Sequence, residues 1–147
     1  MKQNQQGFTF IEVLAVMSII ALATIGVLAL RDWAASNARV ADAKVQIATI
    51  QSGVQQWRPR NGTYTNISIE ELSKVAAVPT DWKSGASINP WGGDISVSVD
   101  GDDATRYVVS FTNIRVAEEG QRLVRDYTEI ASSVNFSGNT LYVTFQG

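Results

Sequence analysis

The stretch GFTFIEVLAVMSIIALATIGVLAL, residues 7–30, determines how this chain is organised. From Phe8 to Leu30 it holds 23 residues, and Glu12 is the only charged residue among them. At about 1.5 Å per residue, a helix of that length spans roughly 34 Å, against a hydrocarbon core of about 30 Å. The run is therefore long enough to cross a bilayer, and yet it keeps a carboxylate near its start.

Two ordinary interpretations account for only part of this pattern. A secretory signal peptide would use Lys2 as its basic region and cut near residues 21–23, Ala-Leu-Ala, but Glu12 would then interrupt its apolar region. A plain membrane anchor explains the length but not Glu12, since a charge near the middle of a membrane helix costs on the order of 2.5–3.5 kcal/mol. A third interpretation uses every feature: cleavage between Gly7 and Phe8 retains the apolar run and places a cationic amine on Phe8, four residues before Glu12.

The residues at this junction carry a family resemblance. The run G-F-T-F-I-E, after a short polar leader and before a long apolar segment, resembles the class III leader junction of type IV pilins and pseudopilins. The resemblance implies a prepilin peptidase that cuts after Gly7 and N-methylates Phe8, and it gives Glu12 the assembly role. The physics agrees with that role. The helix dipole favours an acid near the N-terminus, and in a bundle of helices Glu12 could pair with the Phe8 amine of a neighbouring subunit. Removing one member of such a buried pair typically costs about 3–5 kcal/mol.

The helical pattern continues beyond the apolar run. No proline precedes Pro59, so we expect one helix from about Phe8 to Trp57, apolar in its first half and amphipathic in its second. Apolar residues near the 3.5-residue period form a stripe along residues 31–57, which we expect to pack against the protein's own sheet. The stripe comprises Val40, Ala43, Ile47, Ile50, Val54 and Trp57.

Residues 58–147 read as a globular head. Ser68 and Glu71 form a capping box that opens a short helix to about Ala77, after which residues 80–93 read as a loop pinned to the core by Trp82 and Trp91. Strands are expected at 94–99, 106–112, 133–136 and 140–145, and helical spacing at 116–127 is interrupted by Gly120. The predicted fold class is α+β: a long N-terminal helix packed on an antiparallel sheet of about four strands. The expected domains are a cleaved leader 1–7, a transmembrane or filament-core segment 8–30, a head-packing helix 31–57 and the head 58–147.

The composition excludes several kinds of chemistry. The chain has no cysteine and no histidine, so it forms no disulfide, no Cys/His zinc site and no His- or Cys-dependent catalytic triad. Its formal net charge of −2 gives no basic field for nucleic acid as the primary partner. We expect neither an enzyme nor a cofactor. Asp100, Asp102 and Asp103 are a weak calcium candidate with an incomplete ligand set, and a solvated turn explains them better.

The head is similar in layout to small type IVb-like pilins of the conjugative thin-pilus group, through NGTY (61–64), SINPWGG (87–93) and FTNI (111–114). Those relatives usually carry a cysteine pair, whereas this chain has Gly120 about where the first would lie. The resemblance implies a pilin that waits in the inner membrane, meets the prepilin peptidase and the assembly machinery, and polymerises with copies of itself into an extracellular filament. The alternatives are a type II secretion pseudopilin or minor pilin in a short periplasmic pseudopilus, and a single-pass membrane-anchored binding protein.

Overall fold

The computed structural model describes residue 7 and residues 9–147. The chain separates into two compact units, one ending at Asn37 and one formed by residues 38–147. Helix α1 (Phe10–Trp57) is the helix of the first unit and also the first element of the second.

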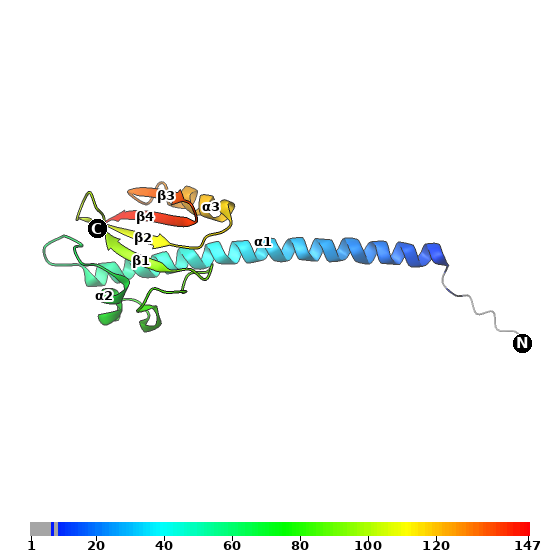
Figure 1. The fold of residues 1–147 in the computed structure, drawn as a ribbon, viewed down its shortest axis with the longest axis horizontal. Coiled ribbons are helices and arrows are strands. Elements are labelled where there is room, and N and C mark those ends of the chain that lie inside the picture. The colour runs from blue at the N-terminus through cyan, green and yellow to red at the C-terminus, as the bar shows by residue number, and fades with distance from the viewer. Residues whose placement is uncertain (1–6, 8) are drawn as a thin grey trace, which may run out of the picture. The chain divides into compact units, whose positions relative to one another are not determined.

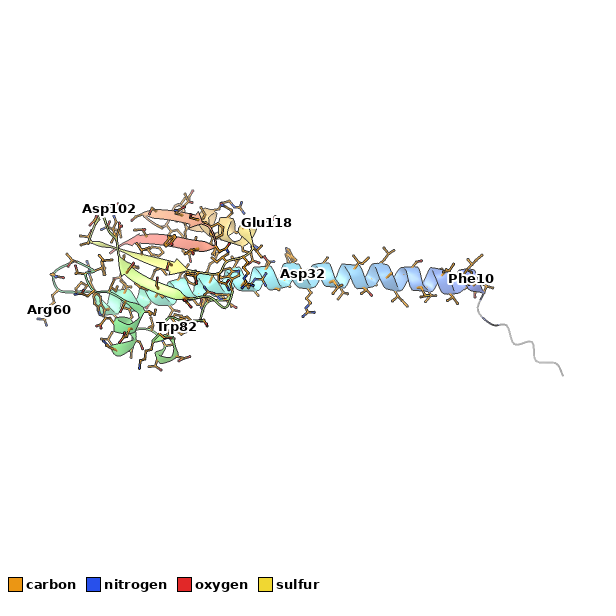
Figure 2. All side chains as sticks on the ribbon, in the orientation of Figure 1. Phe10, Asp32, Arg60, Trp82, Asp102 and Glu118 are labelled. Atoms are coloured by element: carbon orange, nitrogen blue, oxygen red, sulfur yellow. The ribbon has the colours of Figure 1, made fainter. Side chains whose placement is uncertain are left out.

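The first unit presents an apolar helix without cover. Between residues 10 and 30 the large apolar side chains are 43–78% exposed, and Figure 2 shows them projecting from this part of the helix on all sides. In the described part of the chain, α1 is the one helix long and apolar enough to cross a membrane, judged by length and composition. The expected helix is present, and it begins at Phe10. The predicted start at Phe8 lies outside the described residues.

The second unit is built on a four-stranded antiparallel sheet in the order β1-β2-β4-β3 (Figure 1). Its pairings include Val97 with Val109, Val109 with Val143 and Val143 with Val134, so one row of valines crosses all four strands. The elements after α1 are α2 (Ile69–Lys74), the 3₁₀ turn η1 (Thr80–Trp82), β1 (Ile95–Val99), β2 (Arg106–Phe111), α3 (Ala117–Tyr127), β3 (Ser133–Ser137) and β4 (Thr140–Gln146).

The core lies between the sheet and the second half of α1. Along β1, Ser96 and Ser98 are exposed, as period-two patterning requires, whereas Ile95 and Val97 are buried. They form one cluster with the buried face of α1. Trp82 and Trp91 pack against the same cluster, so the loop they belong to is held to the core as expected. The predicted α+β fold, a long helix on a four-stranded antiparallel sheet, is confirmed.

Several boundaries differ from the sequence-based expectation. Helix α2 ends at Lys74 rather than near Ala77, because Ala76 adopts a left-handed φ of 54°. The N–H groups of Ala76 and Ala77 then bond back to the carbonyls of Ser73 and Leu72, which is a Schellman ending. The expected strand ends shift by one residue: β1 begins at Ile95, β2 ends at Phe111, β3 extends to Ser137 and β4 extends to Gln146.

The expected interruption at Gly120 is wrong. Helix α3 runs through this position, and Gly120 is buried. A Cβ added there would lie 2.6 Å from ring atoms of Phe136 on β3. The glycine therefore serves a close approach between helix and strand, which has the same sequence signature as a helix breaker.

Candidate functional site

The predicted processing and assembly residues lie where α1 begins. Gly7 is exposed and outside any helix or strand, and Phe8 lies outside the described residues. Glu12 falls in the first turn of α1 and is exposed. At that position the partial positive charge of the helix N-terminus stabilises a carboxylate, typically by about 0.3–1 kcal/mol at an exposed site.

Thr9 and Glu12 form a reciprocal capping box. The backbone N–H of Thr9 donates to Glu12 Oε2 at 3.2 Å, and the backbone N–H of Glu12 donates to Thr9 Oγ1, also at 3.2 Å. The first helical hydrogen bond, from Val13 N to the Thr9 carbonyl, closes the same turn at 3.1 Å. Two of the four N–H groups that a helix start leaves unsatisfied thus receive side-chain partners.

This capping box was not among the predictions from the sequence, although its spacing is visible there. Thr9-x-x-Glu12 repeats the spacing of Ser68-x-x-Glu71, where the Ser68 hydroxyl accepts from Glu71 N at the start of α2. Glu12 therefore has a partner within its own chain.

The other polar side chains of the apolar run are also satisfied locally. The Ser18 hydroxyl donates to the Leu14 carbonyl at 2.7 Å, and the Thr24 hydroxyl donates to the Ile20 carbonyl at 2.8 Å. Both use the i−4 pattern that hides a hydroxyl against its own helix. Apart from Glu12, the helix consequently presents a surface that suits hydrocarbon or other apolar helices.

The stripe on the second half of α1 lies in the core of the second unit. Its first five members are no more than 2% exposed, and Trp57 is half-buried and stacks on Tyr64 with ring centroids 6.5 Å apart. The fully or nearly buried members are Val40, Ala43, Ile47, Ile50 and Val54. These residues fix α1 to the sheet and are not available to another chain.

The carboxylates of the β1–β2 connection hydrogen-bond within their own turn. Asp100 Oδ1 accepts from the Asp102 backbone, and Asp103 accepts from both the backbone N–H and the hydroxyl of Thr105. The Thr105 hydroxyl, more than its backbone N–H, lowers the pKa of Asp103. Among residue 7 and residues 9–147, no group of three or more acidic, histidine or cysteine side chains is placed to hold a metal ion.

A buried ion pair that sequence reasoning missed joins three distant segments. Glu119 on α3 is 1% exposed, and its carboxylate accepts from Arg39 on α1 and from the indole N–H of Trp91. Arg39 and Glu119 are separated by 80 positions, so no local pattern could link them. A buried carboxylate held by a guanidinium and an indole is a structural clamp.

Two family profiles match the chain. The prokaryotic N-terminal methylation motif matches residues 2–28, and the PilS N terminal family matches residues 37–147, well over half of the chain. Neither the comparison with curated proteins nor the comparison with solved structures gives a significant match.

Each of the two profiles covers one of the two units of the structure. The methylation motif covers the exposed apolar helix and its acid-bearing first turn, and the PilS profile covers the helix-on-sheet unit. Members of this family are structural proteins and not enzymes. The chain belongs to the type IV pilins, as a prepilin of the PilS family.

Proposed function

We propose that prepilin peptidase cleaves this chain between Gly7 and Phe8 and methylates the new amine of Phe8, and that the mature subunit polymerises into a type IV pilus. One observation carries the proposal. The first part of α1, residues 10–30, is long enough to cross a bilayer, is apolar all round and uncovered, and has a single carboxylate in its first turn. The methylation motif over residues 2–28 supports the processing step.

The exposed apolar surface needs a cover in each state of the protein. Before assembly, lipid provides it, so the precursor and the subunit pool reside in the inner membrane. After assembly the filament is surrounded by water, and only the same segment of other copies can cover residues 10–30. The apolar helices then form the filament core, and the PilS units form its outer part.

Glu12 acts in the step between these two states. In a single chain, its carboxylate caps its own helix through Thr9. In a filament core of low dielectric, a carboxylate requires a cationic partner, and the Phe8 amine of an adjacent subunit is suitable. A subunit that docks out of register would bury Glu12 without that partner. Glu12 thus selects the correct register at a modest cost in membrane stability.

The first experiment is N-terminal sequencing and intact-mass measurement of the protein in material sheared from the native cells. We expect chains that begin at N-methylated Phe8 and are abundant in the sheared fraction. Chains that begin at Phe8 but stay in the envelope would instead identify a minor pilin or a pseudopilin. Chains that still begin at Met1, or that begin at Thr24, would overturn the processing site and the role given to Glu12.

A further inference from the structure

The connection between α1 and α2 carries an asparagine in an unusual chemical setting. Asn61 is followed by Gly62, and it is the only asparagine in the sequence with a glycine after it. Both residues are exposed, in a turn that starts at Pro59. Figure 2 shows Arg60 at the outer end of this loop, with its side chain directed away from the sheet and the helices.

The turn holds the side-chain carbonyl of Asn61 over the following peptide. The backbone N–H of Thr63 donates to Asn61 Oδ1 at 3.3 Å, which makes an Asx turn. The nitrogen of Gly62, which would attack Asn61 Cγ, lies between these two groups along the chain. The hydrogen bond also polarises the carbonyl and makes its carbon a better electrophile. The Gly62 N–H donates to the Pro59 carbonyl at 3.3 Å, which is longer than a typical hydrogen bond of this kind.

Sterics and charge favour the same reaction. Gly62 has a φ of 72°, and a Cβ added there would meet nothing within 4 Å, so the backbone has room to move. The exposed guanidinium groups of Arg58 and Arg60 flank the pair in sequence. Their positive charge stabilises a negative charge on the attacking nitrogen and on the oxygen of the tetrahedral intermediate.

We propose that Asn61–Gly62 is a site of spontaneous covalent modification, in which the asparagine becomes aspartate or isoaspartate. The Gly62 nitrogen attacks Asn61 Cγ and forms a new C–N bond. The bond from Cγ to Nδ2 breaks, and Nδ2 leaves as ammonia with the proton that Gly62 N has lost. Water then opens the resulting succinimide at one of its two carbonyls, which gives either acid.

The product adds one carboxylate between two arginines and changes the formal charge of the chain from −2 to −3. The isoaspartate form also places one extra carbon in the backbone. The core can tolerate this change because Tyr64, beyond the turn, is buried and anchored by its N–H to the Ala104 carbonyl at 2.7 Å. The reaction would therefore mark the surface loop of an ageing subunit without unfolding it.

Asn66 provides a matched control within the same chain. It is exposed and has a left-handed φ of 68°, and neither feature would prevent its reaction. Its following residue, however, is Ile67, whose branched side chain is buried and crowds the nitrogen that would attack. Exposure alone predicts equal reaction at both asparagines, whereas the proposed mechanism selects Asn61.

The test is to incubate the purified full-length protein in detergent micelles at neutral and mildly alkaline pH, and to follow each asparagine by peptide mass spectrometry. We expect conversion at Asn61 with loss of ammonia, a rate that rises with pH, isoaspartate as well as aspartate, and no conversion at Asn66. We also expect an acidic species to form on native isoelectric focusing, which Asn61→Gln should abolish and Asn66→Gln should leave unchanged.

The urea-unfolded chain is the reference for intrinsic reactivity. If Asn61 stays an amide in the folded protein under conditions that convert it in urea, the turn blocks the reaction and the proposal fails. The proposal fails as well if Asn66 converts as fast as Asn61, because the selectivity would then have nothing to do with Gly62.

Discussion

Among single residues, Glu12 has an observed capping role and a proposed assembly role, and the two can be separated. As a capping residue it needs only a hydrogen-bond acceptor at Oε2 and a helix start at Thr9. As the assembly residue proposed above it needs a negative charge. Glutamine and glutamate serve equally in a capping box, whereas only glutamate forms an ion pair with an amine. Substitution can therefore separate the two roles.

We predict that Glu12→Ala and Glu12→Gln are both cleaved by the prepilin peptidase but give few filaments. Alanine removes the cap and the charge together, and glutamine removes the charge alone. If the charge selects the register, the two variants should lose filament yield to a similar degree, despite the restored cap in Glu12→Gln. The measurements are the mature N-terminus by mass spectrometry and the amount of pilin in the sheared fraction.

Normal filament yield from Glu12→Gln would show that capping is the whole role of this side chain. Normal filament yield from Glu12→Ala would show that assembly needs neither the cap nor the charge of Glu12. Thr9→Ser is the control for the site, because it keeps a hydroxyl that can accept from Glu12 N and should assemble like the unaltered protein.

For the secondary-structure elements, the close contact between α1 and the segment after α2 sets a steric limit. A Cβ added to Gly53 would lie 2.6 Å from the Ala77 carbonyl oxygen, a backbone atom that cannot rotate away. Alanine in place of glycine gains about 1 kcal/mol of helix propensity, and overpacking costs about 1–3 kcal/mol. We predict that Gly53→Ala is destabilised in urea unfolding, by up to about 2 kcal/mol. Ser52→Ala, at the exposed neighbouring position, should be neutral or slightly stabilised. Equal stability of the two variants would contradict the contact.

The clamp between Arg39 and Glu119 should matter more than an exposed ion pair on the same helix. Replacing Arg39 with methionine takes the guanidinium away from a carboxylate that is 1% exposed. We predict a loss of about 2–4 kcal/mol, below the largest values for buried pairs because Arg39 is itself one-third exposed. The control is Lys44→Met, which breaks the half-exposed pair with Asp126 and should change stability by about 1 kcal/mol or less. Chemical denaturation of both variants measures the two losses of folding stability. Losses of similar size would mean that the clamp contributes no more than a surface ion pair.

The sequence predicts which helices and strands form better than it predicts which of them lie next to one another. The long helix follows from an unbroken run without proline, and the strands follow from alternation such as Ile95, Val97 and Val99. The strand order β1-β2-β4-β3 has no local signature, since β4 inserts between β2 and β3 through backbone pairing. Glycines are ambiguous for a related reason: at Gly120, the ring that requires a glycine belongs to Phe136, on another element.

In the candidate site, too, residues that are close in sequence can be predicted and residues that are far apart in sequence cannot. The Gly7–Phe8 junction and Glu12 stay predictions, and they could be proposed from the sequence because they lie together in the chain. The Thr9–Glu12 box, which the structure shows, was predictable from its spacing. The clamp at Glu119 was not, because its three members come from α1, α3 and the loop before β1.

For the whole protein, we expect the folding stability to fall at alkaline pH. Burial raises the pKa of both Tyr107 and Tyr127 to about 12, and these residues are no more than 8% exposed. They belong to one aromatic cluster through Phe145, with ring centroids 5.6 and 6.1 Å from it. In the unfolded chain a tyrosine ionises near pH 10. The unfolded state therefore releases protons first, and folding stability must fall as pH rises from about 10 to about 12.

We predict that the free energy of unfolding of the PilS unit is insensitive to these tyrosines below pH 9 and falls above pH 10, by roughly 2–3 kcal/mol per tyrosine at pH 12. Urea unfolding of the full-length protein across this range, followed by tryptophan fluorescence, measures it. Tyr127→Phe should halve the alkaline loss, because phenylalanine keeps the ring contact with Phe145 and has no proton to release. An alkaline slope unchanged in Tyr127→Phe would show that other groups, and not the buried phenols, set the upper pH limit of the fold.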